Sequence, residues 1–166
     1  MKVAGIVAEY NPFHNGHAHQ VERTRAPEGG EASHVVAVMS GSFVQRGEPA
    51  IFDKYRRTKA ALLAGADLVL EMPVAFSTAS AHEFAAYGVA LLSSIGVDAV
   101  VFGSECGQIE FLKQAASALN HESAEFQERL RKGLKAGLTY PQARAKALEM
   151  EDTWASVLTS PNNILG

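Results

Sequence analysis

Four short apolar segments, each followed by a helical pattern, restrict what this chain of 166 residues can fold into. The segments are almost continuously apolar and rich in β-branched residues, which is typical of strands buried on both faces of a parallel sheet. They are VAGIVA (3–8), HVVAVMS (34–40), DLVLEMP (67–73) and DAVVFGS (98–104). Because helical patterns separate them, the sequence predicts an α/β fold with a Rossmann-like, doubly wound parallel sheet.

Helix signals between these segments support the alternation. Asp53 can cap a helix that ends at Gly65, and Ser80 and Glu83 have capping-box spacing ahead of a helix that stops at Gly96. Residues 107–150 read as two or three helices with no strand between them. We therefore expect a core over residues 1–106 and a helical extension of the same domain over residues 107–166. Because the chain ends on TSPNNILG, a pattern typical of a helix start, we expect it to be a fragment of a longer protein.

The net charge, the cysteine content and the distribution of charged residues exclude several classes of protein. The net charge of −3 argues against a domain that coats nucleic acid electrostatically, so any RNA-binding surface is expected elsewhere. The single cysteine, Cys106, excludes an internal disulfide and a cysteine zinc cluster, and it fits a reducing compartment. Charged residues interrupt every longer apolar stretch, so no membrane span is expected and a cytoplasmic protein is predicted.

The stretch EYNPFHNGHAH (9–19) follows the first predicted strand. In an open α/β sheet, ligands bind beyond the carboxyl ends of the strands. Gly16 would let a ligand approach the backbone, and the free N–H groups of the helix that starts there favour an anion. His14 and His17 can flank this point and donate hydrogen bonds to phosphate oxygens. The H-x-G-H pattern after a first strand therefore predicts a phosphate site.

Two other interpretations of this stretch stay open. Three histidines, at 14, 17 and 19, could hold a metal ion, although Glu9 is the only carboxylate nearby and Gly16 would then serve no purpose. Alternatively, the histidines are solvated loop residues. The glycine-rich phosphate loops GxxxxGK[ST] and GxGxxG are absent from the sequence.

The segment after the second predicted strand is a candidate substrate loop. Its members are Ser40, Gly41, Gln45 and Arg46, where the arginine could fork onto a carboxylate or phosphate. The alternative is a surface loop with a solvated arginine. The basic residues that follow are predicted to cover a solvated helix face; they are Lys54, Arg56, Arg57 and Lys59.

Two further positions could contact a nucleotide. Gly103, in FGSECG, would leave room for a purine or ribose. Alternatively, this glycine is needed only for the turn of the backbone. Asn162 or Asn163, in SPNNILG, could hydrogen-bond an adenine edge or ribose, or could cap the next helix. Cys106 is predicted to be inert because no histidine partner is evident.

Four stretches together carry a family resemblance: GIVAEYNPFHNGHAH, SGSFVQRGEPAIFDK, FGSECG and SPNNILG. In this order they resemble the bacterial tRNA(Met) cytidine acetate ligase family, which is similar in fold to the HIGH-type nucleotidylyltransferases. The resemblance implies that ATP and acetate form acetyl-adenylate, which then acetylates the wobble cytidine of elongator tRNA(Met). It also implies that tRNA is bound mostly through a region absent from these residues.

The resemblance implies His14 and His17 as the catalytic, phosphate-facing pair, with Mg²⁺ carried on the nucleotide and no metal site of the protein itself. Two positions depart from the family pattern, because His19 follows His17 after one residue and Ser42 replaces the usual asparagine. Competing hypotheses are a small-molecule adenylyltransferase that makes a dinucleotide cofactor and an ATP-binding module without turnover. The implied ATP-binding residues are Val7, Ala8, Glu9, Tyr10, Asn11, Pro12, Phe13, His14, Asn15, Gly16, His17, Ala18, His19, Gln20, Gly103 and Asn162.

Overall fold

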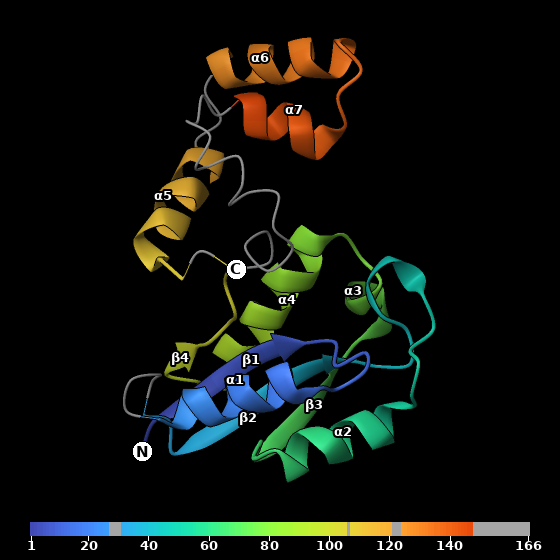
Figure 1. Ribbon diagram of the computed structural model, residues 1–166, viewed down its shortest axis with the longest axis vertical. Coiled ribbons are helices and arrows are strands. Elements are labelled where there is room, and N and C mark those ends of the chain that lie inside the picture. Colours follow the sequence, from blue (N-terminus) through green and yellow to red (C-terminus); the bar gives the residue numbers. More distant parts are fainter. Residues whose placement is uncertain (27–30, 106, 121–123, 148–166) are drawn as a thin grey trace. The chain divides into compact units, whose positions relative to one another are not determined.

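The computed structural model describes residues 1–26, 31–105, 107–120 and 124–147. The chain divides into two compact units, Met1–Phe102 and Gly103–Gly166. The first unit contains the sheet and the helices around it, and the second unit contains helices (Figure 1).

The first unit is built on a parallel sheet of four strands in the order β3-β2-β1-β4. The strands are β1 (Val3–Ala8), β2 (His34–Ser40), β3 (Leu68–Met72) and β4 (Ala99–Val100). The predicted Rossmann-like, doubly wound fold is confirmed. The fourth strand is shorter than the apolar segment 98–104, because only Ala99 and Val100 pair with β1.

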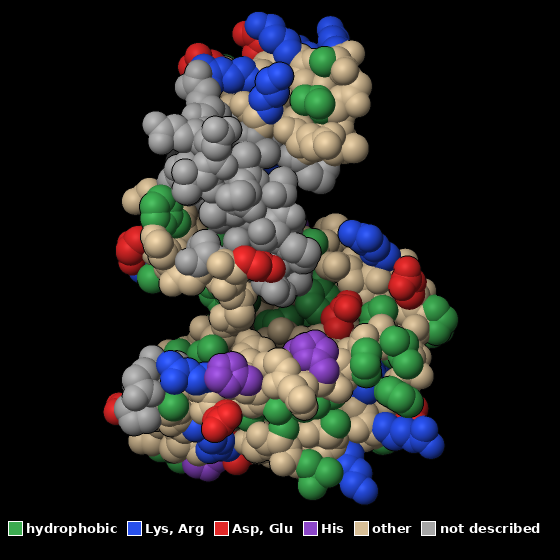
Figure 2. Space-filling model, viewed as in Figure 1, with side chains coloured by type: hydrophobic (Ala, Val, Ile, Leu, Met, Phe, Trp, Pro, Cys, Tyr) green, Lys and Arg blue, Asp and Glu red, His purple; other side chains and the backbone are tan. Residues whose placement is uncertain are grey.

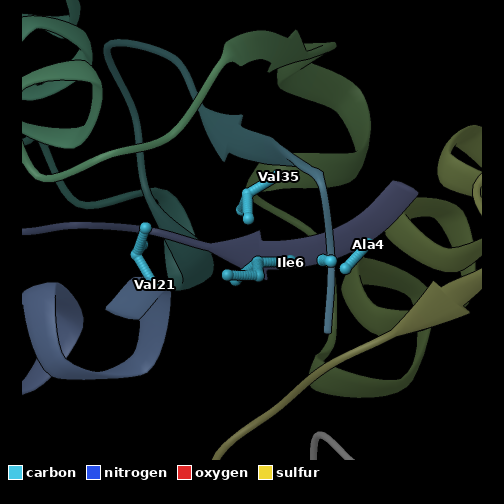
Figure 3. Packing of buried hydrophobic residues seen from close by; sticks show 5 residues of the cluster. Ala4, Ile6, Val21 and Val35 are labelled. Atoms are coloured by element: carbon cyan, nitrogen blue, oxygen red, sulfur yellow. The ribbon is translucent and has the colours of Figure 1, made fainter. Parts of the chain in front are cut away.

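Helices cover both faces of this sheet. On one face lie α1 (Asn15–Arg25) and α2 (Lys54–Leu63), and on the other lies α4 (Ala81–Ser94), preceded by the short α3 (Val74–Ser77). Val21 of α1 packs against Ala4, Ile6 and Val35 (Figure 3). On the opposite face, Phe84 and Leu92 of α4 pack against the following strand residues: Val36, Val38 and Met72. The alternation along each strand thus separates two apolar layers.

The order of the strands places the loop after β1 at a topological switch point. From β1 the chain proceeds outward through β2 to β3, and it then returns past β1 to form β4. The connection from β1 therefore leads to one side of β1, toward β2, whereas the connection from β3 leads to its other side, where β4 lies. Such a point is where open α/β sheets bind ligands.

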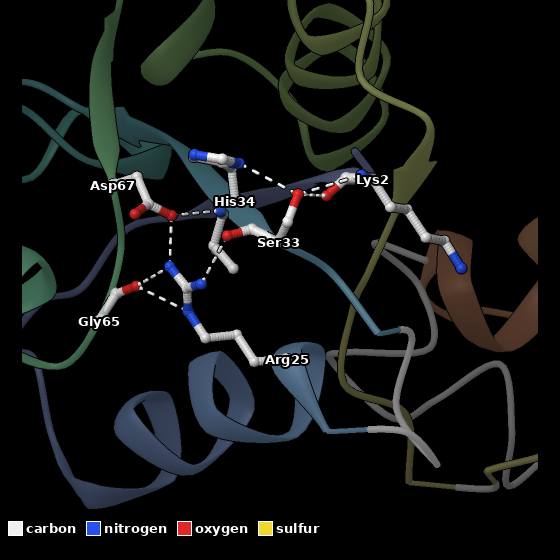
Figure 4. A network of polar contacts seen from close by, with 7 residues as sticks. Lys2, Arg25, Ser33, His34, Gly65 and Asp67 are labelled. Atoms are coloured by element: carbon white, nitrogen blue, oxygen red, sulfur yellow. Dashed lines mark hydrogen bonds and ion pairs between the residues drawn. The ribbon is translucent and has the colours of Figure 1, made fainter.

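The amino edge of the sheet is fastened by a polar network (Figure 4). Asp67 accepts the backbone N–H of Val35 at 2.6 Å and pairs with Arg25. Arg25 also donates to the carbonyl oxygens of Ser33 (2.8 Å) and Gly65 (2.7 Å from Nη2). These contacts join the end of α1 to the starts of β2 and β3, at the edge opposite to the phosphate site that the sequence predicts.

The predicted helix caps are confirmed. The Asp53 carboxylate accepts the N–H of Arg56 at 2.9 Å, and Ser80 and Glu83 form the expected capping box. Gly96, after α4, has a φ of 76°, which residues other than glycine rarely adopt. These local signals explain why the elements begin and end where they do.

The second unit contains α5 (Ile109–Asn120), α6 (Ala124–Lys135) and α7 (Tyr140–Ala147). Helices α6 and α7 approach closely at Gly133, where an added Cβ would lie 2.9 Å from Cβ of Ala143. Phe126 and Ala147 are buried in the same pair of helices. In the described part of the chain, no helix is long and apolar enough to cross a membrane.

Candidate nucleotide-binding site

The loop between β1 and α1 has an unusual backbone that neighbouring segments hold in place. Tyr10 has a φ of 51°, and the Asn11–Pro12 peptide bond is cis. The Glu9 carboxylate accepts the N–H of Gln45 at 2.7 Å, and the Asn11 side chain accepts the N–H of Ile51 at 2.8 Å. Glu9 and Asn11 therefore fix this loop against the segment that follows β2.

His14 and His17 form a reciprocal cap at the start of α1. Nδ1 of His14 accepts the N–H of Gly16 at 3.1 Å, and Nδ1 of His17 accepts the N–H of His14 at 3.3 Å. Because both Nδ1 atoms are acceptors, each neutral ring carries its proton on Nε2. Each histidine therefore presents one N–H donor, and both donors belong to residues at a helix N-terminus, where anions are favoured.

The two imidazoles belong to a cluster of rings. Those of His14 and His17 stack with centroids 3.7 Å apart, and His17 also meets Tyr10 (4.9 Å) and Phe13 (5.5 Å). Burial, which desolvates the ring, and repulsion from a protonated His14 lower the pKa of His17 from 6.5 to about 4. His17 is thus held neutral near physiological pH, as a hydrogen-bond donor rather than a cation.

Gly16 is required by the cap itself. A Cβ at this position would lie 2.9 Å from Cε1 and 3.1 Å from Nδ1 of His14. A side chain would therefore displace the imidazole that caps the helix. The sequence predicted that glycine opens the backbone to a ligand, and the structure adds this contact with His14.

Arg57 is a residue that the sequence placed wrongly. It was predicted on a solvated helix face, but it is buried, with 1% of its surface exposed. Its guanidinium donates to the carbonyl oxygens of Glu9 (2.6 Å), Phe52 (3.0 Å) and Gly41. Arg57 therefore joins the segments that follow β1 and β2. The sequence pattern that could have indicated this burial is the spacing of four between Arg57 and Ala61, which places both on the inner face of α2.

The remaining basic residues of that group differ from Arg57. Lys54 pairs with Glu71 at 2.6 Å, and Arg56 is exposed beside Asp53 at 3.3 Å. Lys59 is exposed. The predicted solvated face is thus confirmed for Arg56 and Lys59.

Several residues of the predicted ATP-binding loop have structural contacts of their own. Val7 and Ala8 pack in the apolar layers of the sheet. The Gln20 amide donates to the carbonyl oxygen of Val101 at 3.4 Å, next to β4. His19 is exposed on α1, and histidine side chains are visible on the face over this helix (Figure 2).

The two other positions predicted to contact a nucleotide, Gly103 and Asn162, do not belong to the loop between β1 and α1. Gly103 is the first residue of the second unit, and Asn162 lies outside the described residues. Their contacts with a nucleotide stay predictions.

The predicted substrate loop contains both buried and exposed members. Ser40 and Gly41 are buried at the carboxyl end of β2, whereas Arg46 is exposed with a φ of 69°. The side-chain nitrogen of Gln45 is buried without a hydrogen-bond partner. The hydroxyl of Ser77 in α3 donates a hydrogen bond to the carbonyl oxygen of Phe43 at 3.0 Å, which connects this segment to α3.

A metal ion has no ready set of ligands here. Within residues 1–26, 31–105, 107–120 and 124–147, no group of three His, Cys, Asp or Glu side chains could hold one. Nδ1 of both His14 and His17 is already bonded to backbone N–H groups. The donor set suits an anion with several acceptor oxygens, such as a phosphate group.

The sequence model of the HIGH Nucleotidyl Transferase family matches residues 1–166. The chain belongs to this family. The HIGH family match agrees with the strand–loop–helix context in which His14 and His17 lie.

Proteins named tRNA(Met) cytidine acetate ligase are similar to this HIGH family chain. Those of Caldicellulosiruptor bescii and Caldicellulosiruptor saccharolyticus are 48% and 49% identical over 166 residues, which is 100% of this chain and 41% of each relative. The crystal structure of Thermotoga maritima TmcAL bound with alpha-thio ATP has a TM-score of 0.89 and 44% identity, over 100% of this chain and 42% of that chain. The chain thus spans about two fifths of the length of the relatives it matches.

Proposed function

We propose that this chain is the nucleotide-binding part of an ATP-dependent ligase that activates acetate as acetyl-adenylate and acetylates the wobble cytidine of elongator tRNA(Met). The observation that carries the proposal is the reciprocal cap of His14 and His17, which leaves two Nε2–H donors at the start of α1. The similarity to proteins named for this reaction supports it. We expect tRNA to be bound mostly by parts of the protein beyond these residues, and the reaction to take place in the cytoplasm.

The chemistry asks the protein mainly for positioning and charge stabilisation. A carboxylate oxygen of acetate attacks the α-phosphorus of ATP, the bond to the β-phosphate oxygen breaks, and pyrophosphate leaves. Negative charge grows on the nonbridging oxygens during this step. The Nε2–H groups of His14 and His17 and the N-terminus of α1 would stabilise that charge. Mg²⁺ carried on the nucleotide would neutralise part of the phosphate charge.

The fixed geometry of the loop supports this role. Stacking and the two Nδ1 bonds restrict the imidazoles before a nucleotide arrives, so little reorganisation is needed during the reaction. The bonds from Gln45 to Glu9 and from Ile51 to Asn11 hold the same loop from the other side. His17, whose pKa is lowered to about 4, can donate to phosphate without a change in protonation. We assign the implied loop residues 7–20 to the ATP site on these grounds.

The test is pyrophosphate release by the full-length protein from ATP, with acetate, and acetylation of cytidine in tRNA(Met). We expect pyrophosphate release to require acetate, and acetylcytidine to form only when tRNA(Met) is present. A nicotinamide or pantetheine phosphate substrate that released pyrophosphate in place of acetate would indicate a cofactor-type adenylyltransferase. ATP binding without any release of pyrophosphate would indicate a module without turnover.

A further inference from the structure

Positive charge is concentrated in the helices α6 and α7, although the chain as a whole is acidic. Residues 124–147 contain six of the fifteen Lys and Arg residues but only two of the eighteen Asp and Glu residues, which gives this segment a net charge of +4. Because the whole chain carries −3, the remaining residues carry −7. The six basic residues are Arg129, Arg131, Lys132, Lys135, Arg144 and Lys146. The net charge of the chain therefore conceals a basic pair of helices.

The packing of α6 against α7 places most of this charge on one side of α6. Phe126 and Gly133 are buried, and Gly133 is the position of closest approach to α7. With 3.6 residues per turn, the side of α6 opposite to these residues carries three exposed cations. We call this surface the basic face of α6; its members are Arg131, Lys132 and Lys135. Figure 2 shows Lys and Arg side chains together over this helix.

Carboxylates compensate only part of the charge of the basic face. Two ion pairs lie along α6, Arg129–Glu125 at 2.5 Å and Lys132–Glu128 at 3.0 Å. The hydrogen bond from Lys132, together with the charges of Lys132 and Arg131, holds the pKa of the Glu128 carboxyl below its usual value. Within the described ranges, no ion pair is found for Arg131 or Lys135. One carboxylate thus opposes three cations. The acidic residues that follow α7 lie outside the described residues; they are Glu149, Glu151 and Asp152.

The stability of α6 does not account for all three cations. Lys132 and Lys135 lie in its last turn, where the helix dipole favours positive charge. Arg131 precedes that turn and lies four residues from Lys135, and like charges at this spacing destabilise a helix. A bound polyanion would compensate this repulsion. Arg131 and Lys135 are separated by about 6 Å along the helix axis, so they could contact neighbouring phosphates of one strand.

We propose that the basic face of α6 binds the phosphate backbone of the tRNA substrate. The inference rests on the proposed function and adds a surface by which these residues contribute to a tRNA complex that other parts of the protein mainly form. Lys and Arg supply most contacts of proteins with nucleic-acid phosphates, and such contacts add affinity without reading the sequence. The basic face would therefore strengthen binding of any tRNA, and the choice of tRNA(Met) would be made elsewhere.

The test compares the full-length double variant Arg131→Glu/Lys135→Glu with the wild-type protein by measuring the Kd for tRNA(Met) at several salt concentrations. The variant keeps two like charges at the same spacing, so its melting temperature should stay near the wild-type value. We expect the Kd to rise about tenfold or more, and the slope of log K against log salt concentration to become shallower by about two. An unrelated tRNA should lose affinity by the same factor. The KM for ATP, measured without tRNA, should not change.

The double variant Lys2→Glu/Lys59→Glu is the matched control, because both lysines are exposed and the net charge changes equally. It should keep the Kd of the wild type. Equal losses of affinity in the two double variants would mean that the net charge is responsible, and an unchanged Kd in Arg131→Glu/Lys135→Glu would place tRNA on other surfaces. Either result would contradict the inference. Loss of binding to phosphatidylglycerol vesicles with an unchanged Kd for tRNA would assign the basic face to a membrane, and would also contradict it.

The same measurements separate this inference from the proposed function. If the wild-type protein binds tRNA through the basic face but does not acetylate its cytidine, the proposed function fails and the RNA-binding face stands. If the wild-type protein acetylates tRNA(Met) and the double variant binds it as tightly, only this inference fails. If the wild-type protein does not bind tRNA, both fail.

Discussion

The imidazoles of His14 and His17 stack 3.7 Å apart while each Nδ1 accepts a backbone N–H at the start of α1. One pair of side chains thus caps the helix and presents two Nε2–H donors. The structural and chemical roles of these residues are coupled, because the hydrogen bonds that cap the start of the helix also fix the tautomer of each ring.

Replacing His14 separates the two roles. His14→Ala should lower the free energy of unfolding by about 1 kcal/mol through loss of the cap, and lower the rate of pyrophosphate release ~10²-fold through loss of a donor. His14→Asn should restore the stability, because asparagine caps helices well, but not the rate. Urea denaturation and steady-state kinetics measure the two effects. Equal rates for His14→Asn and the wild type would show that the Nε2–H of His14 takes no part.

The protonation of His17 should depend weakly on pH in the physiological range. Its pKa is lowered from 6.5 to about 4, so the folded protein binds fewer protons than the unfolded chain between these values. The contribution of His17 to stability is therefore complete above pH 6.5 and decreases as the pH falls toward 4. Histidine NMR shifts followed from pH 8 to pH 3.5 check this expectation. A His17 midpoint near 6.5 would contradict the buried, stacked environment.

Gly16→Ala should weaken ATP binding. The added Cβ would lie 2.9 Å from Cε1 of His14, so the ring must turn away and its cap with the Gly16 N–H is lost. We expect the Kd for a nonhydrolysable ATP analogue to rise about tenfold, which corresponds to one lost hydrogen bond to a charged group. Glu22→Ala, on an exposed turn of α1, is the control and should keep the wild-type Kd. Calorimetry on both variants distinguishes a local effect from a general loss of helix.

Arg57→Met should destabilise the fold far more than Arg56→Met. Arg57 is buried and donates to three carbonyl oxygens, which the substitution would leave without their donor, so we expect a loss of roughly 3 kcal/mol or more in the free energy of unfolding. Arg56 is exposed beside Asp53, and its loss should cost less than about 1 kcal/mol. Urea denaturation compares the neighbours directly. Similar midpoints for both variants would mean that Arg57 does not hold the two loops together.

The sequence predicted the sheet because strands buried on both faces leave an apolar, β-branched pattern, and β1 and β2 match the predicted segments. It overestimated β4, because apolar character continues past Val100 although pairing with β1 stops there. It placed His14 and His17 at the start of the helix after the first strand, where the structure has them, but it did not predict the tautomers, because these depend on hydrogen bonds with the N–H groups of Gly16 and His14. Arg57 was missed because charge suggested a solvated face, whereas the burial of its guanidinium depends on carbonyl groups from distant loops.

The central claim is that the phosphates of ATP are bound by His14 and His17. A crystal structure of the protein with a nonhydrolysable ATP analogue tests it most directly. The account predicts phosphate oxygens within hydrogen-bond distance of Nε2 of both histidines, with both Nδ1 atoms still accepting their backbone N–H groups. Phosphates bound away from the N-terminus of α1, or imidazoles turned so that Nε2 points to solvent, would contradict it.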